Sequence, residues 1–195
     1  MSYNFFAMIN RMKYIDRWAL MRNADTENIC EHSHQVAVIS HALALIGNKK
    51  FGKNHNADRI CLLALYHDAT EVITGDMPTP VKYFNDDIKT AYKNIEKTAS
   101  ERLLDMLPQE FKEDYEPFFS KQEGDLELWK LVKAADKLSA LIKCIEETRA
   151  GNKEFEKALV SQRKLIDEID LPEVEYFTEN FLPSFELTLD EHTKS

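Results

Sequence analysis

The sequence is most informative at residues 62–71, LLALYHDATE, where an apolar helical run ends in an imidazole and two carboxylates. At 3.6 residues per turn, His67 shares a helix face with Leu63, so its ring is expected to point inward beside Asp68. Glu71 follows one turn later. An imidazole and a carboxylate at the end of a buried helix suit a divalent metal. A simple hydrogen bond between the two side chains is the alternative, and this stretch alone does not decide between them.

A second inward-facing histidine is predicted in the helix that precedes this stretch. Asn28 and Glu31 have the spacing of a capping box, which opens a helix that runs to about Ile46. Gly47 can then take the left-handed conformation that stops a helix. The apolar stripe of this helix includes His32 in its first turn, so His32 is a third candidate ligand.

A carboxylate accompanies the apolar stripe of the long helix expected from about residue 128 to Gly151. Asp136 falls beside that stripe, among alanines and leucines. Buried carboxylates are costly unless they are paired or bound to a metal. Asp136 is therefore a fourth candidate ligand, with a salt bridge to a lysine as the alternative.

The other segments read as helices joined by short connections. Apolar spacing predicts helices over about residues 5–14, 60–67, 88–106, 111–119 and 153–169. Residues 16–23 have no helical period, and Arg17 and Trp18 there could bind an anion and stack on a flat ring. Alternatively, Trp18 closes the edge of the core and Arg17 pairs with a carboxylate. A glycine and two prolines make residues 75–80 an irregular loop, either a substrate wall or a connector.

Composition narrows the class of protein. With 195 residues, 44% hydrophobic and 30% charged, the chain fits one soluble all-α domain over residues 1–195, whose helices from about 153–195 pack on the core or form a dimer contact. The net charge of -9 argues against a nucleic-acid polymer as partner. No signal peptide and no membrane span of about 20 apolar residues is recognised. Three scattered cysteines indicate reduced thiols and a cytoplasmic protein.

Taken together, His32, His67, Asp68 and Asp136 form the pattern H…HD…D, and the chain resembles the HD-domain phosphohydrolases. Further motifs are similar to those of the bacterial 5′-deoxynucleotidases of the YfbR type. These motifs are DRW (16–18), TEN (26–28), EHS (31–33), YHDATE (66–71), TGDMPTPVKYF (74–84) and AD (135–136).

The resemblance implies an HD-domain helical bundle and an enzyme with one divalent transition metal, cobalt with manganese, zinc, nickel or iron possible. Its ligands would be His32, His67, Asp68 and Asp136. Arg17 and Trp18 would contact the substrate, with Arg17 orienting the phosphate, and Glu71 would be needed for activity. Asp68 would also touch the nucleotide, whose sugar side would be lined by Asp76, Met77, Pro78 and Thr79. The family's members are homodimers that act on deoxyribonucleoside 5′-monophosphates with little base preference.

The residues support this chemistry independently. Two imidazoles and two carboxylates suit a first-row transition metal, which would polarise a phosphoryl group and activate water. Glu71 can overhang the metal as a general base or as an acid for the leaving oxygen, and the sequence does not decide which. A snug apolar wall from Met77, Pro78 or Trp18 would leave a ribose 2′-hydroxyl without a partner and so favour deoxyribose.

Two other functions fit part of the pattern. The chain could be an HD phosphohydrolase that acts on a deoxynucleoside triphosphate or another nucleotide, or a nucleotide sensor without turnover. A triphosphate pocket would be expected to carry more basic residues than Arg17, Arg22 and Lys82. Two-metal members of the wider superfamily that the chain resembles need further histidines after the HD pair, and here the only later histidine is His192. A sensor would not require both Arg17 and Glu71.

Overall fold

The computed structural model describes residues 2–82 and 84–193, apart from the side chain of Thr79. Within these ranges the chain forms helices and no strand, and an isolated antiparallel bridge joins Asp16 and Asn28. The elements are α1 (Phe5–Ile9), the 3₁₀ turn η1 (Asn10–Tyr14), α2 (Ile29–Lys50), α3 (Ala57–Tyr66), α4 (Glu71–Thr74), α5 (Thr79–Lys82), α6 (Asp86–Leu104), α7 (Gln109–Phe119), η2 (Glu123–Asp125), α8 (Leu126–Arg149), η3 (Lys153–Phe155), α9 (Glu156–Asp167), α10 (Pro172–Asn180), η4 (Leu182–Glu186) and α11 (Leu189–His192). The expected all-α fold is confirmed. No helix in the described part of the chain combines the length and the apolar character needed to cross a membrane.

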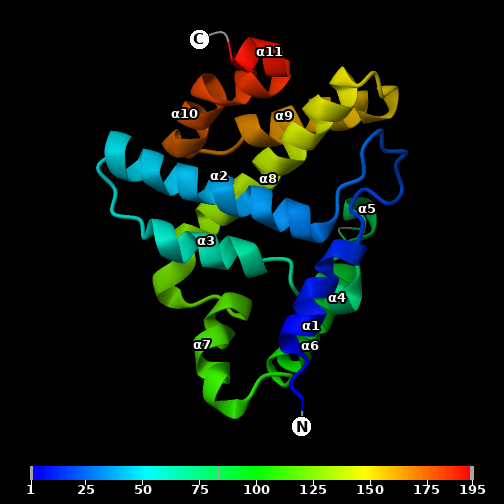
Figure 1. Cartoon of the computed structure of the whole chain (residues 1–195), viewed down its shortest axis with the longest axis vertical. Helices are drawn as coiled ribbons and strands as arrows, with labels where there is room; N and C mark the ends of the chain where they lie inside the picture. Colours follow the sequence, from blue (N-terminus) through cyan, green and yellow to red (C-terminus); the bar gives the residue numbers. More distant parts are fainter. Residues whose placement is uncertain (1, 83, 194–195) are drawn as a thin grey trace.

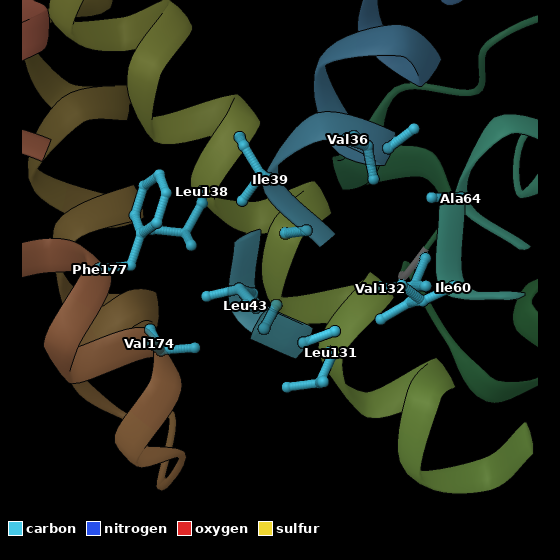
Figure 2. Packing of buried hydrophobic residues seen from close by; sticks show 14 of the residues in the cluster. Val36, Ile39, Leu43, Ile60, Ala64, Leu131, Val132, Leu138, Val174 and Phe177 are labelled. Atoms are coloured by element: carbon cyan, nitrogen blue, oxygen red, sulfur yellow. The ribbon is translucent and has the colours of Figure 1, made fainter. Parts of the chain in front are cut away.

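The core forms where α2 crosses the middle of the molecule between α3 and α10 and packs on α8 (Figure 1). Each of these helices turns an apolar face toward the others, and Figure 2 shows side chains from all four meeting. Fully or almost fully buried members include Val36, Leu43, Ile60, Leu131 and Leu138. Burial of each such side chain contributes roughly 1.5–3 kcal/mol, so this packing fixes how α2, α3 and α8 meet.

The start of α2 is as predicted, whereas its predicted end is wrong. Asn28 Oδ1 accepts hydrogen bonds from the backbone N–H groups of Cys30 and Glu31, and Glu31 Oε2 accepts one from Asn28 N–H, which completes the capping box. The helix does not stop at Gly47 but continues to Lys50. The left-handed residue is Gly52, with φ of 65°.

Gly47 stays helical because other parts of the chain pack against its bare Cα. A Cβ there would lie 2.7 Å from Glu173 Oε1 and 2.8 Å from His55 Cδ2. The glycine at this position therefore allows close approach of α10 and of the connection to α3, and it does not serve as a helix stop.

The remaining segments differ from prediction only in detail. The helix expected over residues 5–14 is α-helical to Ile9 and then tightens into η1. The irregular loop after α4 ends at Pro78, since Pro80 is accommodated in the first turn of α5. Helices α3, α6, α7 and α9 occupy the ranges predicted for them within a few residues.

Candidate active site

Three helices bring the four candidate ligands together. His32 lies in the first turn of α2, His67 caps the C-terminus of α3 with Asp68 next to it, and Asp136 lies in the middle of α8. The Nε2 atom of His32 is 3.1 Å from Asp136 Oδ1 and 3.5 Å from Asp68 Oδ2, and His67 Nε2 is 3.1 Å from the same Asp68 oxygen. Ligand atoms of His32, His67 and Asp68 all lie within 4.8 Å of one another.

The imidazoles are arranged as metal ligands usually are. His67 Nδ1 lies 2.7 Å from the carbonyl oxygen of Ala64, so it carries a proton and donates, and in the neutral ring the lone pair is on Nε2. In the described part of the chain, the buried Nε2 atoms of both His32 and His67 lack a hydrogen bond of suitable geometry. Two orphaned buried nitrogens that face two carboxylates fit a divalent cation between them.

Two groups compete for the other nitrogen of His32. Ser139 Oγ lies 3.1 Å from His32 Nδ1 and donates its own proton to Gln35 Oε1 at 2.5 Å, so it can accept from Nδ1–H. Arg17 Nη1 lies 2.8 Å from the same Nδ1. Metal ligation through Nε2 requires the tautomer with a proton on Nδ1. In that tautomer Nδ1–H would donate to Ser139, and Nδ1 could no longer accept a hydrogen bond from Arg17.

The candidate ligands shift the pKa values of His67, Asp68 and Asp136. Burial by itself lowers the pKa of His67, but Asp68 and Asp136 beside it reverse this effect and bring the pKa to about 9. Burial raises the pKa of Asp68, yet His67 and His32 hold it well below its usual range. Burial raises the pKa of Asp136, but the close approach and charge of His32, with Nε2 3.1 Å away, outweigh this effect and lower it. Both carboxylates are therefore ionised and available to a cation at neutral pH.

Glu71 is nearly buried in α4 and has no hydrogen-bond partner for Oε2 among the described residues. Burial raises its pKa, and the charges of Asp68 and Asp76 raise it further, to about 9, against the opposing effect of Lys82 and Arg17. Glu71 thus holds a proton at neutral pH in the metal-free protein.

Arg17 and Trp18 are held by one carboxylate. Glu27 Oε2 accepts hydrogen bonds from Arg17 Nη1 at 2.7 Å and from Trp18 Nε1 at 3.0 Å. The Trp18 ring packs against Phe155 with ring centroids 5.4 Å apart, and Arg17 Nη2 lies 4.0 Å from Asp136. Arg17 therefore pairs with a carboxylate and Trp18 lies at the edge of the core, but the pair also stands beside the candidate ligands.

The loop after α4 contributes one charged group to this region. Burial raises the pKa of Asp76, Arg17 lowers it and Asp68 raises it again, which places its carboxylate within the field of the site. Met77 and Pro78 are half-buried on the same loop, and the structure gives no contact between them and the four candidate ligands. The side chain of Thr79 lies outside the described part of the chain.

A cavity of about 260 Å³ adjoins the candidate ligands. His67, Asp68, Glu71 and Asp136 lie in its wall, together with aromatic residues and two lysines of α7, α8 and the turn between them. A larger cavity of about 700 Å³ lies along the outer face of α2, and its described lining contains none of the four. The smaller cavity is therefore the candidate site, although Arg17, Trp18 and Asp76 are not among its lining residues.

The sequence prediction missed the residues that hold the functional side chains. Glu27, which binds both Arg17 and Trp18, appeared only as part of a motif. Ser139, Lys143 and Glu147 were not singled out. Their spacing could have revealed them, because steps of three, four and four residues from Asp136 put all of them on one stripe of α8.

Comparisons with known proteins agree with this geometry. The family described as 5′-deoxynucleotidase YfbR-like matches residues 4–185. The 5′-deoxynucleotidase of Vibrio vulnificus is 53% identical over 188 residues, which cover 96% of this chain and 97% of that protein. The 5′-deoxynucleotidase YfbR of Escherichia coli is 52% identical, with 96% and 94% covered. A solved HD-domain phosphohydrolase of Listeria innocua has the same fold, with a TM-score of 0.81 at 22% identity over 93% of this chain and 88% of that one.

The chain thus has the fold of HD-domain phosphohydrolases, and three of its candidate ligands, His32, His67 and Asp68, lie close enough together to hold a metal ion. Within this class, the chain belongs to the YfbR-like 5′-deoxynucleotidase family.

Proposed function

We propose that this protein is a metal-dependent 5′-deoxynucleotidase. It hydrolyses deoxyribonucleoside 5′-monophosphates to a deoxyribonucleoside and inorganic phosphate, with little preference among bases. The observation that carries the proposal is the meeting of two unpartnered imidazole Nε2 atoms with two ionised carboxylates, beside Arg17 and the buried Glu71. Membership of the family supports the substrate class.

His32, His67, Asp68 and Asp136 would together hold one divalent ion. The mixed nitrogen and oxygen donors favour a first-row transition metal, and we propose cobalt, with manganese, zinc, nickel or iron(II) as substitutes. When bound, the ion supplies a Lewis acid that polarises the phosphoryl group and lowers the pKa of water. Asp68 also contacts the nucleotide in this proposal.

Arg17 and Glu71 carry out the steps that belong to the protein itself. Arg17 orients the substrate phosphate and balances the charge on its oxygens, and Glu27 keeps the guanidinium in place for this. Glu71 holds a proton that it gives to the leaving 5′-oxygen. Its pKa of about 9 without metal supports the acid role, and a nearby dication would lower this pKa toward the working pH.

The sugar is proposed to lie against Trp18 and the segment of Asp76, Met77, Pro78 and Thr79. A close apolar wall there would leave a 2′-hydroxyl unpaired and so disfavour ribonucleotides. A smaller side chain at Met77 or Trp18 is expected to raise the rate on AMP relative to dAMP.

We further propose a single-domain homodimer in the cytoplasm that binds no nucleic-acid polymer. The shared core of α2, α3, α8 and α10 supports one domain, and the net charge of -9 disfavours a polyanionic partner. Cys30, Cys61 and Cys144 are all free thiols, which suits a reducing compartment.

The test is phosphate release from dAMP, dGMP, TMP, dUMP, AMP, dATP and 3′-dAMP, after metal stripping and after adding back cobalt. The proposal predicts metal-dependent release from the deoxynucleoside 5′-monophosphates alone, and its loss in Glu71→Ala. Release from dATP would favour the triphosphate alternative. Binding of dAMP without any release would favour the sensor.

A further inference from the structure

A buried ion pair on α8 is not used by the proposed chemistry. Lys143 Nζ lies 2.5 Å from Glu147 Oε1, and the two side chains are 7% and 1% exposed. Burying an ion pair costs desolvation energy that the mutual attraction often only offsets, so such a pair is weak evidence for stability by itself. The groups that the pair holds indicate its role.

The pair and Asn152 satisfy the backbone of residues 22–25, on the segment that carries Arg17 and Trp18. Glu147 Oε2 accepts a hydrogen bond from Ala24 N–H at 2.8 Å, and Oε1 accepts one from Asp25 N–H at 3.1 Å. Lys143 donates to the carbonyl oxygen of Asp25. Asn152 Nδ2 lies 2.7 Å from both Glu147 Oε2 and the Arg22 carbonyl oxygen, so it links the two.

The segment needs such support because it has little structure of its own. Between Asp16 and Asn28, the described chain forms no helix; its own backbone hydrogen bonds are one beside the bridge, from Arg17 N–H to the Glu27 carbonyl oxygen, and one in a turn, from Met21 N–H to the Trp18 carbonyl oxygen. Trp18 has φ of 58°, a left-handed conformation that costs a non-glycine residue energy and persists only where its surroundings enforce it. Trp18 packs on Phe155, and Lys143 Nζ lies 5.9 Å from the centroid of the same ring.

The same helix also carries part of the candidate metal centre. One stripe of α8 carries Asp136, Ser139, Lys143 and Glu147. This helix therefore supplies a candidate ligand, the hydrogen-bond partner of His32, and the Lys143–Glu147 pair that binds residues 22–25, which we call the α8 clamp. We propose that Glu147 is a positioning residue, which fixes residues 17–27 on α8 and thereby sets Arg17 and Trp18 relative to the metal centre. This inference rests on the proposed function.

The test is Glu147→Gln, an isosteric change. The side-chain amide has one acceptor oxygen where the carboxylate has two. Its NH₂ group would face an N–H donor of the protein, so the hydrogen bonds accepted by that carboxylate oxygen would be lost. Misplacing a catalytic group by about 1 Å can cost roughly a hundredfold. We expect kcat/KM for dAMP to fall by roughly tenfold to a hundredfold, with KM raised, while cobalt affinity stays within about twofold of the wild type.

Glu146→Gln is the matched control, because Glu146 is the exposed neighbour on α8 and no described hydrogen bond or ion pair involves its side chain. It is expected to leave kcat/KM and cobalt affinity unchanged. Asn152→Ala, which removes the link to Arg22 at a less buried position, is expected to shift kcat/KM in the same direction by a smaller factor. This variant keeps the inference testable if Glu147→Gln does not fold.

A second readout does not depend on turnover. The chain has two tryptophans, so Trp129→Phe leaves Trp18 as the single reporter. In that background, Glu147→Gln should make Trp18 fluorescence more accessible to acrylamide. Unchanged quenching and unchanged kcat/KM in a folded Glu147→Gln protein would overturn the inference, as would a parallel loss of cobalt affinity. If the wild type hydrolyses no deoxynucleotide, the proposed function fails while the quenching comparison still tests the clamp.

Discussion

His67 shows how a single side chain couples metal binding to protons. Its pKa of about 9 in the metal-free protein means that the imidazole is charged at pH 7, held so by Asp68 and Asp136. A metal can bind only the neutral ring. Metal and proton therefore compete for Nε2, and the two acidic neighbours that attract the metal also retain the proton.

This competition predicts proton release. In a Glu71→Gln background, which removes the other group with a pKa near 9, cobalt binding at pH 7 should release about one proton per chain. Cobalt affinity should fall by about tenfold for each unit of pH below 9. Calorimetry in buffers of different ionisation enthalpy measures both quantities. Binding without proton release, or an affinity that is flat between about pH 6 and 8, would contradict the assignment of His67.

The buried carboxyl group of Glu71 is expected to lower the free energy of unfolding of the metal-free protein at pH 7, although the proposed activity requires this residue. Its folded pKa of about 9 lies above the ordinary value of 4.5, so its contribution to stability is complete below pH 4.5 and is lost as the pH rises toward 9. Glu71→Gln cannot ionise. The metal-free variant should therefore exceed the wild type in free energy of unfolding at pH 7 by on the order of 3 kcal/mol, while its activity falls by about 10²- to 10⁴-fold.

Urea unfolding of the metal-free proteins between about pH 5 and 8 measures this difference. The gap between variant and wild type should widen as the pH rises. Glu110→Gln, at an exposed position on α7, is the control and should show no such gap. A Glu71→Gln protein that is less stable than wild type across the range would show that the buried carboxylate is ionised and paired.

Helix α2 shows what sequence patterns can and cannot predict about an element. The capping box at Asn28 is a local signal, because its hydrogen bonds join residues three apart, and it located the start of the helix correctly. Gly47, where the pattern placed the end, is explained by Glu173, which lies more than a hundred residues away and leaves no room for a Cβ there. A glycine that permits close packing and a glycine that stops a helix look the same in the sequence.

Gly47→Ala tests this interpretation of α2. Alanine in a helix interior should stabilise it by roughly 0.5–1 kcal/mol. The new Cβ would instead lie 2.7 Å from Glu173 Oε1 and 2.8 Å from the His55 ring, and we expect overpacking to win, with a net loss of about 1–3 kcal/mol in the free energy of unfolding.

Gly124→Ala is the matched control for chemical denaturation, since a Cβ there meets no atom within 4 Å. It should change stability by less than about 1 kcal/mol, in the stabilising direction. If Gly47→Ala proved as stable as wild type, the packing of Glu173 against α2 would be too loose to explain the glycine.

Across the whole molecule, local patterns predicted the helices, and the spacing of polar residues on apolar faces predicted the candidate ligands. His32, His67 and Asp136 could be selected because a polar residue on a buried stripe is unusual. The spacing on α8 could have marked Glu147 as a polar residue on the same stripe as Asp136, but not the groups that it and Glu27 bind. Glu27 and Glu147 act on a segment without periodicity, and their partners are fixed by packing between distant parts of the chain.

The arrangement also explains why the site lies where it does. Helices α2, α3 and α8 meet in the core (Figure 1), and the polar side chains of His32, His67, Asp68 and Asp136 that they carry or adjoin lie close together. The large apolar interface between them positions the ligands more rigidly than a loop could. A loop-based group, Arg17, is then tied to this frame through Glu27 and the α8 clamp.

The central claim is that one divalent ion, held by side chains from α2, α3 and α8, is required for hydrolysis of deoxyribonucleoside 5′-monophosphates. The most direct measurement is phosphate release from dAMP as cobalt is titrated into the metal-stripped protein. The account predicts no release without cobalt and a rate that saturates at about one equivalent per chain. Release without metal, or a rate that needs about two equivalents, would contradict it.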